Sequence, residues 1–208
     1  MLEHDSIVRY VEFSPIANQI LTVTWEGQAY IWQESSTPNN WDERDRITLV
    51  EGSFDNDVIF ASYSPQGDYI ATAHDNGKVR IWDTEGEWLF DLDGHLLQVN
   101  AIAFDTNGDQ IITASNDDTI RIWDTTGRNL VIINEHKGDV LSLSISPDGK
   151  HLLSGSADNT ARLWPNYGDL NAMIATAEEY LHILLLPDQC ALNFDEAFCA
   201  IAQNQPQQ

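Results

Sequence analysis

The sequence predicts an all-β protein built from a repeated unit of short antiparallel strands. Three observations predict this class: a tryptophan that recurs at near-constant spacing, apolar runs that alternate with polar residues, and turn residues at the same place in each repeat. Alternation with a period of two is typical of half-buried strands, and Gly, Pro, Asp and Asn between the runs are typical of hairpin turns. The chain has 208 residues, enough for several such units.

The repeat is defined by two marker positions. The first marker is the tryptophan, found as Trp32, Trp82, Trp123 and Trp164 at spacings of 50, 41 and 41 residues. The second lies 28 residues before each tryptophan and is occupied by His4, Phe54, His95 and His136, with a valine four positions later in every case. The markers divide the chain into repeats at about 1–52, 53–93, 94–134 and 135–164.

Between the markers, each repeat has the same internal order. An alternating run comes first, as VRYVEF, VIFASY, VNAIAF and VLSLSI, and a turn follows it, as SPIAN, SPQG, DTNG and SPDG. The second run is QILTVT, YIATAH, QIITAS and HLLSGS, and after another polar turn a third run ends in the tryptophan. After Trp82 and Trp123 a further turn leads into EWLFDL and NLVIIN. Each complete unit is therefore predicted to hold four strands, a to d, joined by hairpins.

Taken as a set, these motifs resemble the WD-repeat propeller family, in which a Gly-His pair opens the unit and Trp-Asp closes strand c. The resemblance covers about residues 1–164 and is most complete in the third and fourth repeats. It implies four propeller blades within residues 1–168, the last without its d strand, and hence a partial or open propeller. Seven blades are usual in the family.

In that family the histidine, a Ser or Thr on strand b, an Asp in the b–c turn and the tryptophan form a hydrogen-bonded tetrad. The resemblance implies His95, Thr113, Asp117 and Trp123 in the third repeat and His136, Ser154, Asp158 and Trp164 in the fourth. The first repeat offers His4, Thr22, Glu26 and Trp32. The second offers Phe54, Thr72, Asn76 and Trp82, so it is expected to lack both the imidazole and the charge. A buried carboxylate is costly unless it is paired, which the imidazole would achieve.

Other chemistries fit the same residues less well. His, Asp and Ser together could form a hydrolase triad, and the three marker histidines could bind a metal. A catalytic set is seldom repeated at a fixed offset, however, and histidines of successive blades should lie too far apart to share one ion. DTNGDQ places Asp105, Asn107 and Asp109 like the start of a calcium loop, but Gln110 stands where glycine is expected. We expect no catalytic residues, no metal and no cofactor.

The pattern breaks at two places. An insertion at 33–46, QESSTPNNWDERDR, accounts for the 50-residue spacing and is expected to be a loop between strands c and d, with Trp41 either anchoring a partner or folding back on the blade. After Trp164, residues 169–203 show helical spacing of apolar residues, and 204–208 should be a frayed end. This tail resembles the C-terminal end of longer bacterial WD-repeat proteins.

The expected missing strand leaves three arrangements open. In closed propellers of the family an N-terminal segment usually supplies strand d of the last blade, yet this chain begins almost directly at His4. The chain could be a fragment of a larger propeller, an open arc, or half of a ring closed by two chains that associate through their open blade edges. The fragment or the open arc is favoured over closure by two chains.

The charge composition limits the classes of partner that the protein is expected to bind. Asp and Glu total 33 against 10 Lys and Arg, a formal net charge of −23, which disfavours nucleic acid and anionic membranes and favours a basic protein. Only two cysteines and no apolar run of about 18 residues point to a cytoplasmic protein.

We therefore expect a non-enzymatic scaffold that binds a protein partner through the face formed by its d–a and b–c loops. The predicted partner-binding residues lie in these loops beside the tetrad positions: Trp25, Asp57, Asp75, Gln98, Asn116 and Asp139. An alternative is the C-terminal sensor part of a larger bacterial signalling protein, an NTPase or protease linked to a propeller. An in-frame continuation of the gene upstream of Met1 would favour this alternative.

Overall fold

A computed structural model describes residues 2–35, 41–49 and 57–166, without the side chains of residues 42–45. The contacts divide the chain into two units, and the fold described here is that of the first, Met1–Trp164. The predicted helical tail at 169–203, the predicted frayed end at 204–208 and the second-repeat marker Phe54 lie outside the described residues.

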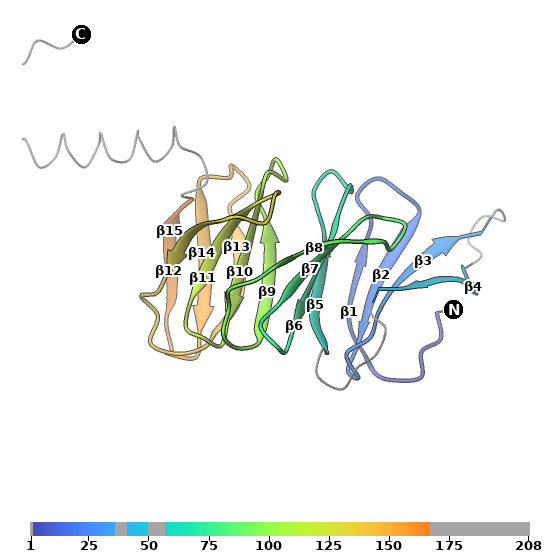
Figure 1. Cartoon of the computed structure of the whole chain (residues 1–208), viewed down its shortest axis with the longest axis horizontal. Coiled ribbons are helices and arrows are strands. Elements are labelled where there is room, and N and C mark those ends of the chain that lie inside the picture. The colour runs from blue at the N-terminus through green and yellow to red at the C-terminus, as the bar shows by residue number, and fades with distance from the viewer. Residues whose placement is uncertain (1, 36–40, 50–56, 167–208) are drawn as a thin grey trace, which may run out of the picture. The chain divides into compact units, whose positions relative to one another are not determined.

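Four antiparallel sheets, which we call blades 1 to 4, follow one another along the chain (Figure 1). Blade 1 comprises β1 (Val8–Phe13), β2 (Gln19–Thr24), β3 (Ala29–Glu34) and β4 (Trp41–Thr48). Blade 2 comprises β5 (Val58–Tyr63), β6 (Ile70–His74), β7 (Val79–Trp82) and β8 (Trp88–Leu92). Blade 3 comprises β9 (Val99–Phe104), β10 (Gln110–Ser115), β11 (Ile120–Asp124) and β12 (Asn129–Ile133). Blade 4 comprises β13 (Val140–Ile145), β14 (His151–Ser156) and β15 (Ala161–Pro165).

The all-β class and the repeated unit of four antiparallel strands are confirmed. In every blade the strands pair in the order in which they occur in the chain, as consecutive hairpins require. Blade 4 has three strands within the described part of the chain. Among the same residues, no helix is long and apolar enough to cross a membrane.

The prediction that 33–46 forms a loop is wrong over much of its length. Strand β3 continues to Glu34, and β4 begins at Trp41, which pairs with Glu34 in the antiparallel register. The insertion therefore lengthens the c–d hairpin, and Trp41 is a half-buried strand residue. Strand d is the outermost strand of its blade, so it needs no regular apolar face, and a polar sequence such as WDERDRIT is compatible with it.

The core lies between consecutive blades. We call the side of a blade that faces the preceding blade its near face, and the opposite side its far face. The far face of blade 1 packs Leu21 and Ile31 against Val58 and Tyr63 on the near face of blade 2. The far face of blade 2 packs Ile81, Leu92 and Phe60 in the same way against Val99 and Phe104 of blade 3. Sheet faces thus supply the apolar burial that stabilises the fold.

The b–c turns require a left-handed backbone at the position five residues before each tryptophan. Blades 1 and 2 place Gly27 and Gly77 there, with φ of 74° and 86°. Blades 3 and 4 place Asp118 and Asn159 there, with φ of 65° and 67°. Asp and Asn are among the few non-glycine residues that adopt this conformation at moderate cost. The turn geometry is therefore the same in all four blades despite the different residues.

Candidate functional site

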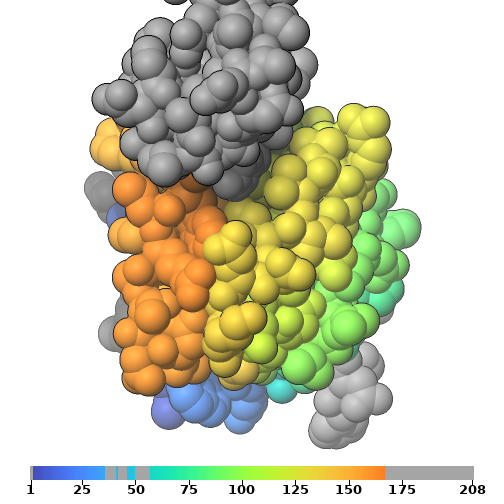
Figure 2. Space-filling model, turned by 90° about the vertical axis from the view of Figure 1, so that its left-hand side faces the viewer, coloured from blue at the N-terminus to red at the C-terminus, as the bar shows by residue number. Residues whose placement is uncertain are grey.

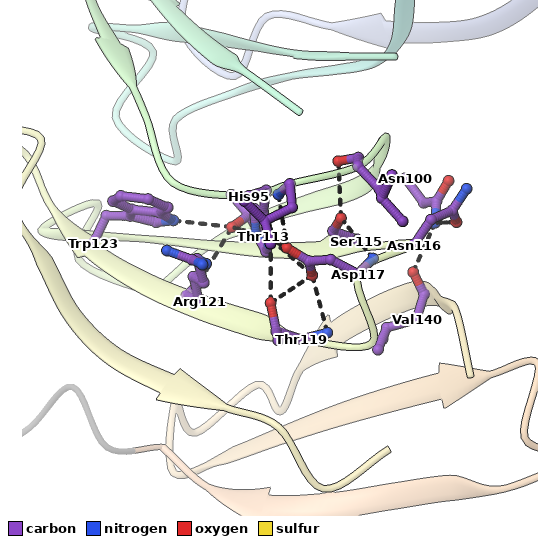
Figure 3. A network of polar contacts seen from close by, with 12 residues as sticks. His95, Asn100, Thr113, Ser115, Asn116, Asp117, Thr119, Arg121, Trp123 and Val140 are labelled. Atoms are coloured by element: carbon purple, nitrogen blue, oxygen red, sulfur yellow. Dashed lines mark hydrogen bonds and ion pairs between the residues drawn. The ribbon is translucent and has the colours of Figure 1, made fainter. Parts of the chain in front are cut away.

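The polar network of blade 3 joins two strands, β10 and β11, to the loop before β9 and to the turn between β10 and β11, around one hydroxyl group (Figure 3). Thr113 Oγ1 on β10 lies 2.9 Å from the indole nitrogen of Trp123 and 2.7 Å from His95 Nε2. His95 Nδ1 lies 2.9 Å from Asp117 Oδ2. Because an ionised carboxylate only accepts, the imidazole donates from Nδ1 to Asp117. The four groups are therefore linked in series from Trp123 to Asp117.

Asp117 is the charged residue at the end of this hydrogen-bonded series. Burial alone would raise the pKa of its carboxyl, but hydrogen bonds from His95, from Thr119 and from the backbone N–H of Leu96 outweigh burial and hold the pKa well below its usual range. The carboxylate is therefore ionised at neutral pH. It ties the loop that precedes β9 to the turn between β10 and β11.

Blade 4 repeats the arrangement with a serine at the centre. Ser154 Oγ lies 2.9 Å from Trp164 Nε1 and 2.8 Å from His136 Nε2, and His136 Nδ1 lies 2.8 Å from Asp158 Oδ2. Hydrogen bonds from Thr160 and His136 hold the pKa of the Asp158 carboxyl well below its usual range. The structure thus brings together all four residues that the family resemblance implied for this blade.

Blade 1 contains three of its four expected members in contact. His4 Nε2 lies 2.8 Å from Thr22 Oγ1, which also accepts the Trp32 indole N–H at 2.9 Å. Glu26 is exposed and takes no part in these two hydrogen bonds. The longer side chain in the turn therefore does not reproduce the role that aspartate has in blades 3 and 4.

Blade 2 differs from the sequence expectation in its imidazole. Thr72 Oγ1 accepts the Trp82 indole N–H at 2.9 Å, and His74 Nε2 lies 2.8 Å from the same hydroxyl. His74 is fully buried and belongs to β6, two residues after Thr72. Asn76 accepts the backbone N–H of Lys78 within its own turn. The expectation that this blade lacks an imidazole is therefore wrong, because the ring comes from strand b instead of from the d–a loop.

The central hydroxyl groups of these networks are buried and connect the strands to the loops, so they are not placed to contact a substrate. Thr72 and Thr113 are fully buried, and Ser154 is 1% exposed. Each hydroxyl is also engaged by an indole N–H, so its oxygen does not face solvent as a nucleophile would. Within the described residues, no three His, Cys, Asp or Glu side chains are grouped so that they could hold a metal ion.

A backbone hydrogen bond next to each network joins the d–a loop to the b–c turn, in the same way in all four blades. In every blade the N–H group of the turn residue donates to the carbonyl group three residues beyond the marker position. The pairs are Trp25 with Ile7, Asp75 with Asp57, Asn116 with Gln98, and Ala157 with Asp139, at 2.7 to 3.0 Å. We call this surface, formed by the d–a loops and b–c turns, the loop face.

All six predicted partner-binding residues belong to these pairs, but they are not equally accessible. Trp25 is 66% exposed and stacks under the guanidinium of Arg9 at 5.2 Å. The other five are half-buried: Asp57, Asp75, Gln98, Asn116 and Asp139. Trp25 is therefore the member with the largest surface available to a partner.

Gln98 and Asn116 are held together by a third amide that the sequence analysis did not single out. Asn100 accepts from Gln98 Nε2 at 2.8 Å and donates to Asn116 Oδ1 at 2.6 Å. Figure 3 shows Asn100 beside Asn116. Asn100 also donates to the carbonyl of Val140 at 2.9 Å, which connects blade 3 to blade 4. These amides therefore have a positioning role between blades in addition to any contact with a partner.

The sequence analysis also missed apolar residues of the loop face. Ile7 is 72% exposed, and Leu96 and Leu97 in the loop after His95 are 81% and 53% exposed. Large apolar side chains at that exposure in loops next to a rigid scaffold are candidates for contact with a partner. The consecutive leucines in GHLLQV were a usable indication, since turns of this kind are normally polar.

Fold and network together define a WD-repeat protein, and the comparison with known families agrees. The WD40 family, described as WD domain, G-beta repeat, matches residues 46–83, 86–124 and 127–165. Each matched segment contains strands a to c of one blade and begins within or just before strand d of the blade before it. The segments cover more than half of the 208 residues, and the chain belongs to this family.

A mouse relative, periodic tryptophan protein 2 homolog of Mus musculus, is 33% identical over 64 residues. The matched stretch is 31% of this chain and 6% of the mouse protein. The chain therefore matches only a small part of the length of that relative. WD40 repeats are typical of protein-interaction scaffolds, which is the class of function that the family indicates for this chain.

Proposed function

We propose that the chain is a scaffold that binds a protein partner on its loop face. The observation that carries this proposal is the contrast between the buried networks, which are alike in all four blades, and the loop-face residues beside them, which differ. In every blade the indole N–H bonds the central hydroxyl at 2.9 Å, and an imidazole lies beside that hydroxyl. The paired residues just outside these networks differ from blade to blade. A fixed frame that carries variable side chains is the arrangement expected of a recognition surface.

The chemistry of the loop face favours a partner segment that is both basic and apolar. Asp57 and Asp75 provide carboxylates in blade 2 and Asp139 provides one in blade 4, and the chain as a whole carries a net charge of −23. Trp25 and Leu96 provide exposed apolar surface on the same face. Aromatic residues and well-placed charges at the centre of an interface contribute most of the binding energy. A Lys- or Arg-rich segment with interspersed apolar residues fits this combination.

The test is a comparison of two tryptophan variants by affinity capture from a lysate of the organism that makes the protein. Trp25→Ala combined with Asn116→Ala changes the loop face. Trp88→Ala changes a tryptophan that is 57% exposed on β8, outside the loops, and is the matched control. We expect proteins captured by the wild-type chain to be lost with the double variant and retained with the control. Retention of all partners by the double variant would contradict the proposal.

The charge of the partner is tested with an array of synthetic peptides. Peptides that combine Lys or Arg with apolar residues are compared with versions in which each basic residue is replaced by Glu. We expect binding only to the basic set, and we expect it to weaken as salt rises from about 0.05 to 0.5 M, because screening reduces the attraction. Equal binding of both sets would show that the acidic residues of the loop face do not select the partner.

A further inference from the structure

A pocket lies between blades 1 and 2, on the near face of blade 2. Its volume is about 520 Å³, and all of its lining residues belong to the described part of the chain. The end of blade 1 contributes Thr48 and Leu49, and blade 2 contributes two tryptophans, Trp82 and Trp88. Sites for small molecules have volumes of about 300 to 1,000 Å³ and combine apolar or aromatic walls with a few polar groups. The pocket has the size and the walls of such a site.

The two tryptophans belong to neighbouring strands, where Trp82 of β7 pairs with Trp88 of β8. Trp82 is almost fully buried in the apolar cluster that contains Leu49, whereas Trp88 is 57% exposed. The Trp88 indole N–H donates to Asp91 Oδ1 at 2.9 Å, which holds the exposed ring in one orientation. The pocket thus presents one buried indole ring and one ring whose orientation is set by a hydrogen bond.

In the other three blades a guanidinium group of the chain lies over the marker tryptophan. The pairs are Arg46 with Trp32 at 5.4 Å, Arg121 with Trp123 at 5.9 Å, and Arg162 with Trp164 at 5.9 Å. The last pair belongs to blade 4, whose orange atoms lie at the surface in Figure 2. A cation within about 6 Å of the centre of an indole ring is attracted by the negative face of the ring. A guanidinium over the marker tryptophan is therefore a repeated feature of the fold.

Blade 2 is the exception. Arg80 stands two residues before Trp82, as Arg121 stands before Trp123, but its Nε lies 3.6 Å from Asp91 Oδ1. Asp91 is opposite Arg80 in the strand register, where blade 3 places the apolar Ile132 opposite Arg121. Within the described residues, no Arg or Lys side chain lies over the Trp82 ring. The pocket lies beside the one marker tryptophan that has no such cation.

The charged groups around the pocket favour a cation as its ligand. Arg80 and Lys78 both pair with Asp91, at 3.6 and 3.2 Å, and Lys78 also lies 3.4 Å from Asp93. Glu87 lines the pocket, and its carboxylate forms no ion pair or hydrogen bond with another described residue. Three carboxylates therefore face two cations here, and the chain as a whole carries a net charge of −23.

We propose that this pocket binds a small guanidinium compound, which stacks against Trp82 and Trp88 and pairs with the Glu87 carboxylate. A guanidinium fits better than an ammonium group, because it is planar, stacks on aromatic faces and is more weakly hydrated. None of the loop-face pairs lines the pocket, so the site is separate from the loop face and independent of the proposed function. Trp88→Ala is accordingly expected to lose this ligand and to keep the partners of the loop face.

The experiment titrates the ¹⁵N-labelled full chain with free arginine at low salt and follows the tryptophan indole N–H signals by NMR. The signal missing from Trp88→Ala identifies Trp88. We expect a saturable shift of the Trp82 and Trp88 signals, with a dissociation constant of about 1 mM for a ligand of this size. Citrulline, which has the shape of arginine without the charge, should cause no saturable shift. Lysine should bind at least about fivefold more weakly than arginine.

Three variants test the assigned residues. Trp88→Ala should weaken arginine binding at least about tenfold and Glu87→Gln about fivefold, and both positions are exposed, so folding is retained. Trp25→Ala, which removes a tryptophan 66% exposed on the loop face, is the matched control and should bind arginine normally.

Four results would overturn the proposal. They are the absence of a saturable shift up to about 20 mM arginine, equal binding of citrulline, unchanged binding by Trp88→Ala, and loss of binding in Trp25→Ala. A tripeptide with a central arginine and blocked ends separates a free ligand from a side chain of a partner. It should bind no more tightly than free arginine, and tighter binding would assign the pocket to a partner chain instead of a small molecule.

Discussion

The central hydroxyl of blade 2 supports the sharpest prediction, because sequence and structure give different expectations for it. Thr72→Val removes the hydroxyl and keeps the shape of the side chain. The change leaves two buried groups without their partner, the Trp82 indole N–H at 2.9 Å and the His74 imidazole nitrogen at 2.8 Å. Each stranded buried group costs about 1 to 3 kcal/mol, so we expect a loss of about 2 to 6 kcal/mol in the free energy of unfolding.

The comparison variant is Thr113→Val in blade 3, whose hydroxyl has the same two kinds of partner at 2.9 and 2.7 Å. Urea unfolding of both variants, followed by tryptophan fluorescence, should show similar losses. Thr106→Val in the exposed turn after β9 is the control and should change the free energy by no more than about 0.5 kcal/mol. If Thr72→Val resembled Thr106→Val and only Thr113→Val were destabilising, His74 would not replace the missing marker imidazole, and the reasoning would be refuted.

Two further predictions concern the acid end of the network and the tight turns. Hydrogen bonds lower the folded-state pKa of Asp117. Its contribution to the free energy of unfolding is therefore complete above the unfolded-state pKa of about 4, and it is lost as the pH falls through the lower folded-state pKa. Asp117→Asn should therefore destabilise by about 1 to 3 kcal/mol at pH 7, and urea titrations should show the gap to wild type narrowing below about pH 4; a constant gap down to about pH 2 would contradict this. Gly77→Ala should cost more than Gly127→Ala in the same assay. Both have φ near 86° and pay about 1 to 2 kcal/mol for the left-handed backbone, but only the Gly77 Cβ would lie 2.7 Å from the His95 carbonyl oxygen, whereas at Gly127 the nearest atom is a Phe90 ring carbon at 3.3 Å. Equal losses in the free energy of unfolding would show that the loop at His95 moves to accommodate the added Cβ.

The sequence and the structure agree most closely where the physics is local. The runs VNAIAF and VLSLSI coincide with β9 and β13, because alternation within six residues defines which side chains share a sheet face. Turn residues with a positive φ mark the ends of strands b and c for the same reason. Strand β4 was missed because it lies at the edge of its blade and needs no alternation.

The networks show where a residue's position in the repeat predicts its contacts and where it does not. In blades 3 and 4 the implied residues lie together, since a repeat of constant length places equivalent residues at equivalent points in space. In blade 2 the position of the imidazole is instead filled from β6 by His74, which stands where blades 3 and 4 have serine. Only the tertiary structure reveals this, because a hydrogen bond depends on where the ring lies and not on its place in the repeat.

By itself, the sequence determined the repeated unit, its hairpin order, the buried tryptophans and the acidic surface, all of which follow from residue type and spacing. The tertiary structure decided which residues are accessible. Ile122 and Leu163 occupy the same place in IRIWD and ARLWP, yet one is fully buried and the other is 65% exposed. The local sequence of a strand defines its apolar face, but whether that face is covered depends on a neighbouring surface, which no pattern within the strand records.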